Sequence, residues 1–268
     1  EATQRFAQTF ETLAEELELP TDPDSQVYQS VAGYYENEFK PRLEKAGQSW
    51  HGTQNYIPSS APGCIAQYMY LSNNPNPVGE KLNLDRAQEI CDYNAWHRSY
   101  HATIKRFLES YGYYDIFLFD LKGNLVYSVY KETDYGTNFL TGPYKDTNFG
   151  DVYRACLNAQ VGEVVIEDFK HYEPSYGAAA SFTGSPIFHD GVRVGVAVFQ
   201  MPVDNINTTM ASREGLGQTG QCYLVGPDFL MRSNSPFNTK DQTTILAQQV
   251  NTDAVKRAFE SKRNYVSF

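Results

Sequence analysis

Two histidines, His97 and His101, stand four residues apart in a segment whose apolar spacing predicts a helix. This spacing places both imidazoles on one helical face, within reach of one metal ion, and Glu89 and His51 are conceivable further ligands. A helical zinc protease would carry its general-base glutamate directly after the first histidine, where this chain has Arg98. We therefore expect no metal and predict that the two imidazoles fix the helix to a neighbouring sheet.

A glycine motif, G-x-G-x-x-G, occurs at residues 215–220. The dinucleotide fingerprint must follow a strand and open a helix, so that phosphate meets the helix N-terminus. Here a helix is predicted before the motif and a strand after it, so we interpret it as a flexible joint. The sequence has no G-x-S-x-G elbow, P-loop or cysteine–histidine pair with catalytic spacing. We therefore favour binding over catalysis and expect no catalytic residue and no cofactor.

The four cysteines, Cys64, Cys91, Cys156 and Cys222, include no C-x-x-C pair, which argues against a zinc ribbon or a thioredoxin-type site. Cys64 and Cys91 lie on successive predicted helices and could form a disulfide if those helices pack antiparallel. We favour the alternative, in which all four are buried free thiols.

Polar and aromatic residues gather on predicted strands and adjoining loops in the middle of the chain. The candidate ligand-binding set is Tyr127, Lys131, Tyr144, Asp146, Tyr172, Tyr176 and Ser181. Ligand pockets combine apolar walls with a few aimed polar groups, and Lys131 could pair with an anionic group. The alternative for any single tyrosine is ordinary packing with its hydroxyl in water. We predict a small-molecule pocket between a sheet and the loops at residues 133–146 and 172–176.

The composition argues against several classes of partner. A net charge of -10 disfavours nucleic acid, whose phosphates are bound by Lys and Arg, and disfavours anionic lipid surfaces. The longest apolar stretch, residues 192–203, is interrupted by Gln200 and Pro202 and is too short to span a bilayer. Because the chain begins at Glu1 without a methionine, we expect a fragment of a longer protein.

Helical patterns dominate residues 1–110, which we expect to form an N-terminal helical region. Residues 2–19 have apolar positions at helical spacing. A second helix is predicted to run to Phe39 and to stop near Pro41, and a short helix is predicted at residues 66–71.

The longest helix is predicted at residues 84–110, capped by Asn83 or Asp85. Its apolar positions, Ile90 among them, are expected to face a core.

Residues 111–203 have the pattern of a small mixed module. The predicted strands are 115–120, 125–131, 163–169, 178–188 and 192–201, with a helix at 149–159. Gly123-Asn124 and Asp190-Gly191 are hairpin signals, because these residue types accept the positive φ of tight turns. Five antiparallel strands with one intervening helix are typical of a PAS-like domain, so the predicted fold class is α+β.

Residues 204–268 repeat the start of this pattern more weakly. A helix is predicted at 204–215, strands at 221–225 and 229–233, a helix at 243–261 and a third strand at 265–268. We expect a linker followed by a second PAS-like module that is incomplete at its C-terminus.

As a set, these segments resemble the double-Cache (tandem PAS-like) extracytoplasmic sensor of bacterial receptors, and more narrowly that of membrane sensor histidine kinases. The resemblance covers most of residues 66–235. It is carried by N-P-N-P-V-G-E-K at 74–81, H-R-S-Y-H at 97–101, G-Y-Y-D-I-F-L-F-D at 112–120, V-Y-S-V-Y-K-E at 126–132, G-P-Y at 142–144, P-S-Y-G-A at 174–178, V-F-Q-M-P at 198–202, Y-L-V-G-P-D at 223–228 and Arg232-Ser233.

The resemblance implies a non-enzymatic input domain on the periplasmic side of a bacterial inner-membrane protein, with a homodimer formed through the N-terminal helices. Ligand bound by the membrane-distal module would shift helices that enter the membrane. The alternatives are a chemoreceptor or nucleotide-cyclase output, or a ligand-free relay driven by a partner protein. The amino-acid-binding version of the family carries a Tyr, Arg, Trp-Tyr and Asp set that does not occur here, since Trp96 precedes His97. The expected ligand is a small carboxylate or another small polar metabolite.

Overall fold

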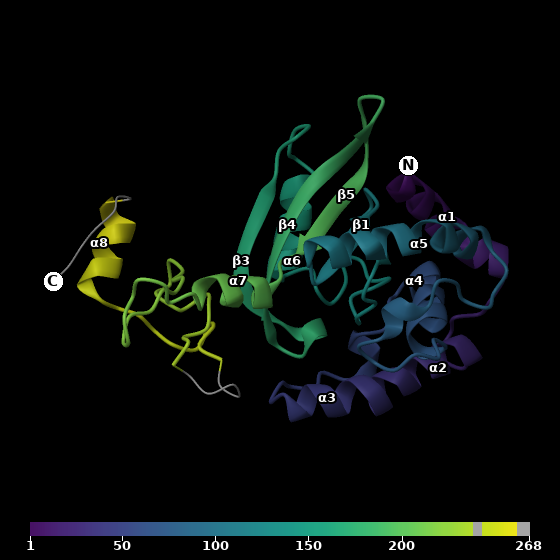
Figure 1. The fold of residues 1–268 in the computed structure, drawn as a ribbon. Coiled ribbons are helices and arrows are strands. Elements are labelled where there is room, and N and C mark those ends of the chain that lie inside the picture. Colours follow the sequence, from purple (N-terminus) through teal and green to yellow (C-terminus); the bar gives the residue numbers. More distant parts are fainter. Residues whose placement is uncertain (238–242, 262–268) are drawn as a thin grey trace.

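A computed structural model of the chain describes residues 1–237 and 243–261. Helices come first, an antiparallel sheet of five strands follows, and a mostly irregular C-terminal part ends the described chain (Figure 1). The prediction of an α+β fold, with helices ahead of a PAS-like sheet, is confirmed.

The helices before the sheet pack through aromatic and aliphatic side chains. They are α1 (Ala2–Leu17), α2 (Gln26–Tyr34), α3 (Lys40–Lys45), α4 (Ala61–Gln67) and α5 (Asp92–Tyr111), with π-helical turns at Tyr35–Phe39 and Tyr68–Ser72 and 3-10 turns at Thr53–Asn55 and Lys81–Asn83. In α1 the buried residues Phe6, Phe10 and Leu13 follow the predicted helical spacing. None of the helices in the described part of the chain is long and apolar enough to cross a membrane.

The second predicted helix does not stop near Pro41. A π-helical turn extends α2, and in it the Lys40 N–H bonds to the Tyr35 carbonyl, five residues back. Helix α3 then begins, and Pro41 lies in its first turn. Proline is tolerated in a first turn, where its missing N–H is not needed. The π turn therefore lets the helical path continue through a residue that would otherwise end it.

Helix α5 begins at Asp92 rather than at residue 84. The segment before it lies along the helix, because the carbonyl groups of Leu82 and Asp85 are bonded to two histidine rings of α5, at 2.8 and 2.7 Å. Neither predicted cap residue lies at the start of the helix. The expected burial of Ile90 is also wrong, since its side chain is 86% exposed.

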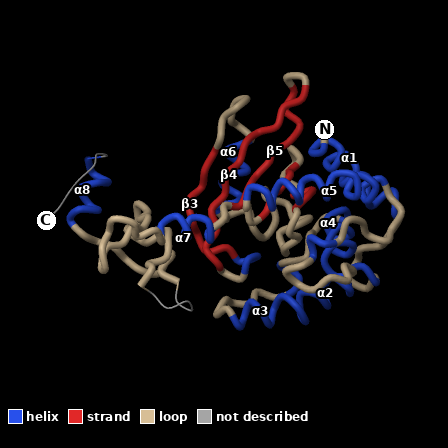
Figure 2. The backbone as a smooth tube through the Cα atoms, viewed as in Figure 1, coloured by secondary structure: helices blue, strands red, loops and turns tan. Residues whose placement is uncertain are grey.

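The sheet has the order β2-β1-β5-β4-β3, and all neighbours are antiparallel. Its strands are β1 (Asp115–Phe119), β2 (Leu125–Ser128), β3 (Val165–Tyr172), β4 (Ala178–His189) and β5 (Val192–Gln200). Helix α6 (Asn148–Cys156) covers one face, where Phe149 stacks on Phe182 with 4.4 Å between ring centroids. Helices α1 and α5 lie on the other face, where Phe107 contacts Phe199 (Figures 1 and 2). The sheet therefore lies between two layers of apolar side chains, one on each face.

Both hairpins predicted in the first module form. In the β4–β5 turn, Asp190 and Gly191 have φ angles of 50° and 76°, as a tight two-residue turn requires. In the β1–β2 turn, the Asp120 carboxylate accepts the N–H groups of Lys122 and Asn124, at 2.9 and 2.8 Å. Local turn chemistry therefore determines both connections.

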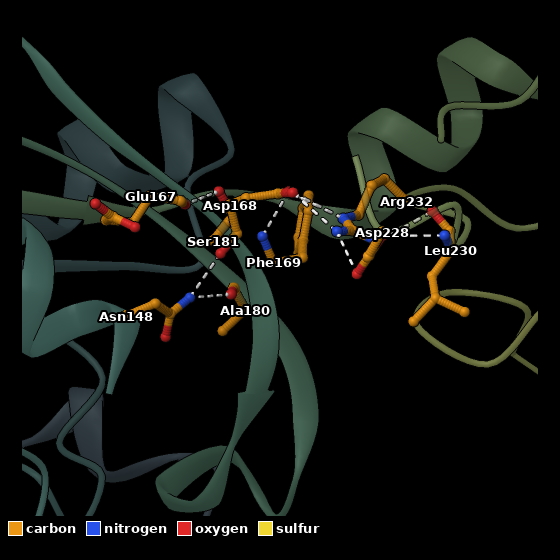
Figure 3. Close-up of polar contacts among 9 residues, drawn as sticks. All are labelled: Asn148, Glu167, Asp168, Phe169, Ala180, Ser181, Asp228, Leu230 and Arg232. Atoms are coloured by element: carbon orange, nitrogen blue, oxygen red, sulfur yellow. Dashed lines mark hydrogen bonds and ion pairs between the residues drawn. The ribbon is translucent and has the colours of Figure 1, made fainter. Parts of the chain in front are cut away.

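The edge strand β3 contains a bulge between Glu167 and Lys170. Asn148, at the start of α6, donates from Nδ2 to the carbonyl groups of Asp168 and Ala180, at 2.8 Å each, and so ties the bulge to β4 (Figure 3). A bulge changes the direction of the side chains beside it. Here the Asp168 carboxylate points toward the C-terminal part of the chain (Figure 3).

The C-terminal part departs most from the prediction. Its helices are α7 (Val203–Met210) and α8 (Asp253–Ser261). The segments predicted as strands, 221–225 and 229–233, are joined by a single isolated bridge among the described residues. One reason is that the Ser233 hydroxyl, rather than a carbonyl, accepts the Leu224 N–H, at 3.0 Å.

Helix α8 is also shorter than the helix predicted over residues 243–261. Leu246 has a φ of 57°, which a continuous right-handed helix does not allow. Its N–H bonds instead to the Met231 carbonyl, at 2.9 Å. The segment before α8 is therefore used to pair with the hairpin. The predicted third strand at residues 265–268 lies outside the described residues.

None of the four cysteines, all within the described ranges, forms a disulfide. Cys64, Cys91 and Cys156 are buried, which confirms the prediction of buried free thiols for these three. Cys222 is exposed, because its segment does not join the sheet.

Candidate functional site

The candidate site is built on the loop that follows β2, residues 129–136. Asp115 organises its first turn: Oδ1 accepts two N–H groups of the loop, at 2.9 and 3.0 Å, and Oδ2 accepts the Ser128 hydroxyl, at 2.6 Å. The Ser128 Oγ in turn accepts the Lys131 N–H, at 2.9 Å. These bonds hold Lys131 at a φ of 64°, a left-handed conformation that is uncommon outside glycine.

The Lys131 side chain is enclosed by tyrosine rings. It is 2% exposed, and its Nζ donates to the Ser128 carbonyl. The Nζ lies 4.7, 5.2 and 5.3 Å from the ring centroids of Tyr127, Tyr135 and Tyr70. Burial favours the neutral amine and lowers the pKa of Lys131, whereas the nearby Asp115 carboxylate and the cation–π contacts favour the charged form.

Two carboxyl groups of the same loop lie close by, of which Asp134 is buried and Glu132 half-buried. Glu132 accepts the hydroxyls of Tyr114 and Ser175, at 2.9 and 2.7 Å. Asp134 accepts the Tyr172 hydroxyl at 2.6 Å, and its Oδ1 has no hydrogen-bond partner in the described part of the chain. Burial raises the pKa of Glu132 well above its ordinary value and that of Asp134 to about 7. Protonation of these groups makes the site less negative than its sequence suggests.

Helix α4 fixes the far end of the loop. Gln67 donates from Nε2 to the carbonyl groups of Thr133 and Tyr135, at 3.1 and 2.8 Å. The backbones approach closely at two glycines, since a Cβ placed on Gly63 would lie 2.3 Å from the Gly136 carbonyl oxygen. Residues far apart in the sequence therefore fix the conformation of this loop.

A small chamber of about 90 Å³ lies beside Lys131. It is lined by Tyr34, Val78, Gly79, Lys81, Tyr114, Tyr130, Lys131, Glu132, Thr133, Pro174 and Tyr176. An outer groove of about 570 Å³, between α2 with its π turn and the loop at residues 72–81, shares Tyr34, Val78 and Lys81 with the chamber. The groove and the chamber are therefore neighbouring spaces with common walls.

Three of the predicted site residues meet at or beside the chamber. Lys131 and Tyr176 line it, and Tyr127 packs against the Lys131 amine. Tyr176 has a φ of 54°, so the chamber wall contains two residues other than glycine in left-handed conformation. Strained backbone of this kind is often found at binding sites.

The other four predicted residues lie behind the loop or away from it. Tyr144 is buried and bonds to the Thr133 hydroxyl, at 3.0 Å, and Tyr172 is buried against Asp134. Ser181 donates to the Glu167 carbonyl at 2.8 Å within the sheet (Figure 3). Asp146 is exposed. Neither Ser181 nor Asp146 lines the chamber.

Sequence reasoning missed Asp115, Glu132 and Asp134 as members of the site. The available signal was the run K-E-T-D at 131–134, set between aromatic residues. Such a run ordinarily indicates a solvated turn. In the folded protein this run is shielded from solvent because the N-terminal helices pack onto the loop.

The two histidines of α5 hold neighbouring segments to the helix. The His101 Nδ1 lies 2.7 Å from the Tyr127 hydroxyl on β2 and its Nε2 lies 2.8 Å from the Leu82 carbonyl, so His101 links helix and sheet as predicted. The ring of His97 instead bonds to the Asp85 carbonyl, ahead of the helix. Across the residues that the structure describes, no group of three or more His, Cys, Asp or Glu side chains is placed to hold a metal ion.

No protein-family model matches the sequence, and no curated protein matches it. Solved structures do. The chain is similar in fold to Cache-type sensor domains. One is the extracellular domain of a proposed histidine kinase, mmHK1S-Z2, at 17% identity and a TM-score of 0.41, covering 88% of this chain and 82% of that one.

Two further matches are chemoreceptor domains. The sensory domain of Tlp3 from Campylobacter jejuni is 12% identical with a TM-score of 0.38, covering 98% of this chain and 83% of that one. The ligand-binding domain of PctC from Pseudomonas aeruginosa, solved with GABA, is 15% identical with a TM-score of 0.36, covering 58% of this chain. The match spans only 61% of the PctC chain.

Proposed function

We propose that this chain is the extracytoplasmic sensor domain of a membrane-bound signalling receptor, and that it binds a small polar molecule rather than catalysing a reaction. The observation that carries the proposal is Lys131, a buried amine in left-handed backbone at the wall of a chamber with an outer groove. A buried lysine in an aromatic enclosure is costly to the fold. The buried Asp115 carboxylate already provides one counter-charge, and an anionic ligand would add a second.

The proposed ligand is a small carboxylate or a similarly small polar metabolite. Its anionic group would lie beside Lys131, and Lys81, which lines both the chamber and the groove, would add a second cation. Protonated Glu132 and Asp134 would not repel it, since burial raises the pKa of both carboxyls. The chamber of about 90 Å³ admits a few non-hydrogen atoms, because one water takes roughly 30 Å³ of liquid.

The proposed parent protein is a sensor histidine kinase of a bacterial inner membrane, with this chain on the periplasmic side as a homodimer. In this proposal residues 1–110 form the helical region, residues 111–203 the membrane-distal module and residues 204–268 the linker and membrane-proximal module. Chemoreceptor or cyclase outputs are the alternatives. The sequence resemblance supports the input domain more narrowly than the output.

Thermal unfolding in the presence of short mono- and dicarboxylates tests the site. A ligand at a hundred times its dissociation constant should add about 2.7 kcal/mol to the free energy of unfolding. Lys131→Met should abolish this gain. Lys170→Met, at a side chain 58% exposed on β3, is the matched control and should retain it. A gain that persists in Lys131→Met, or that no carboxylate produces, would overturn the site.

A second candidate function is a ligand-free relay driven by a partner protein. The small volume of the chamber favours it, because typical small-molecule sites hold roughly 300–1,000 Å³. The two candidates differ in the screen: the relay predicts no stabilisation by any small carboxylate, amine or amino acid while the protein remains folded.

A further inference from the structure

A separate cavity lies where the sheet meets the C-terminal part of the chain. Its volume is about 570 Å³, within the roughly 300–1,000 Å³ of small-molecule sites. The start of β4, the end of β5, α7 and the segment around Ile245 form its walls. Apolar side chains are prominent, among them Tyr113, Ala179 and Met201. We call this space the junction cavity.

One buried polar side chain in the wall lacks a partner. Gln200 is 4% exposed, and its Oε1 accepts no hydrogen bond from the described residues. Its backbone is fixed, because the Gln200 carbonyl accepts the Tyr114 N–H, at 3.1 Å, and the residue pairs with Asp115 and Phe182 in the sheet. An unsatisfied buried amide oxygen destabilises the fold, and a polar group in the cavity that donates to it would remove this cost.

The charge of the lining restricts what could bind. The described residues that line the junction cavity include Asp204 and His171 but neither lysine nor arginine. A carboxylate would therefore find no permanently charged cation there, and the Asp204 side chain would repel it. An uncharged or cationic molecule with an apolar body fits this lining better.

A polar wall separates the junction cavity from the chamber beside Lys131. Tyr114 lines both spaces, and its hydroxyl donates to Glu132, a residue of the chamber, at 2.9 Å. Ser175, which lines the junction cavity, donates to the other oxygen of the same carboxyl, at 2.7 Å. Substitutions at residues that line only one of the two spaces, such as Ala179 and Lys131, therefore test them separately.

We propose that the junction cavity is a second small-molecule site, which takes an uncharged or cationic amphipathic molecule whose polar end pairs with the Gln200 amide. This site does not depend on the function proposed for the chamber. The junction cavity lies between the sheet and the C-terminal part of the chain. A molecule bound in the cavity would therefore contact both.

Ligand-observed NMR with three six-carbon probes, hexan-1-ol, hexylamine and hexanoate, tests the proposal on the 268-residue chain. Hexan-1-ol and hexylamine should bind at least about tenfold more tightly than hexanoate, because of the lining charge. Ala179→Trp, which fills the cavity, should remove binding. Ala102→Trp, on an exposed position of α5, is the control and should leave it intact.

Two further variants keep the test decisive. Gln200→Leu should weaken hexan-1-ol about fivefold, the loss of one hydrogen bond worth about 1 kcal/mol, even if Ala179→Trp does not fold. Lys131→Met should leave hexan-1-ol binding unchanged, which separates this site from the chamber. Equal binding of hexanoate, full binding by Gln200→Leu, or no binding of any probe to the folded chain would overturn the proposal.

Discussion

Arg232 of the C-terminal part pairs with Asp168 of β3, although 64 residues separate them in the sequence (Figure 3). The guanidinium donates from Nε to both carboxylate oxygens, at 3.0 and 3.1 Å, and from Nη2 to Oδ2, at 2.9 Å. Its Nη2 also meets Asp228, at 2.9 Å, within the hairpin itself. One side chain, 8% exposed, therefore joins the sheet to the segment that follows α7.

Arg232→Met should loosen the hairpin without unfolding the sheet. We expect a loss of about 1–2 kcal/mol, below the full value of charge-assisted bonds, because the Asp168 and Asp228 side chains are 48% and 47% exposed and can be rehydrated. Hydrogen exchange should quicken at residues 224–235 and stay slow in β1 and β5.

Two comparisons sharpen this expectation. Gly226→Ala should give the same local exchange pattern, because a Cβ there would lie 2.2 Å from Nη2 of Arg232 and would displace the flexible guanidinium. Arg154→Met breaks an ion pair with Asp151 in which both side chains are 39% exposed, and should change stability by less than about 0.5 kcal/mol. Unchanged exchange in the hairpin of Arg232→Met would contradict the assigned role.

Asp134→Asn should stabilise the protein above neutral pH. Burial raises the pKa of Asp134 to about 7 in the folded state, whereas an unfolded aspartate titrates near ~3.9. The folded state thus holds a proton that the unfolded state has lost, and stability falls by up to about 1.4 kcal/mol per pH unit between these values. The amide cannot ionise, so its advantage should grow from pH 4 to pH 8. Chemical denaturation at both pH values measures it, with the exposed Asp146→Asn as control.

His101 should remain neutral at pH 5. Burial, followed by the charge of Lys131, lowers its pKa to about 3, compared with ~6.5 in an unfolded chain. As the pH falls through this window the unfolded state takes up a proton that the folded state refuses, so stability is lost on acidification. Nitrogen-15 NMR should show the tautomer with the proton on Nε2, which faces the Leu82 carbonyl. An imidazolium signal for this residue at pH 5 would refute the assignment.

Gly63→Ala should disturb the candidate site from outside it. The added methyl group would lie 2.3 Å from the Gly136 carbonyl oxygen, a backbone atom that cannot turn aside. We expect a loss of roughly 1–3 kcal/mol, as for other overpacked sites, together with loss of any carboxylate binding by the Lys131 chamber. Gly162→Ala has open space around its Cβ and controls for packing, although its φ of 80° adds backbone strain.

Sequence patterns succeeded where the determinants are local. The β4–β5 connection depends on Asp190 and Gly191, whose own backbone preferences select the turn, and the α1 core positions follow from helical spacing alone. They failed at Leu246, because the competing partner for its N–H is the Met231 carbonyl on a different segment. The residues next to Leu246 in the sequence do not predict this long-range hydrogen bond.

The site shows the same division. Lys131 and Tyr176 could be proposed from residue type, and both line the chamber. The desolvation of Glu132 and Asp134 could not be predicted from residue type. It comes from helices that pack over the loop, through contacts such as that of Gln67 with Thr133. Desolvation is a property of the assembled fold, and a list of residue types does not contain it.

The bulge in β3 has a consequence for association between sheets. An exposed edge strand is a template to which another strand can add, but here the ladder is interrupted between Glu167 and Lys170, and Arg232 is bonded to Asp168 at the interruption. A strand of another molecule could form a regular ladder of backbone hydrogen bonds with β3 only before or after the bulge. The stretch ahead of the bulge carries Ile166, which is 69% exposed. Aggregation along this edge is therefore expected to begin there, and Ile166→Lys should suppress it.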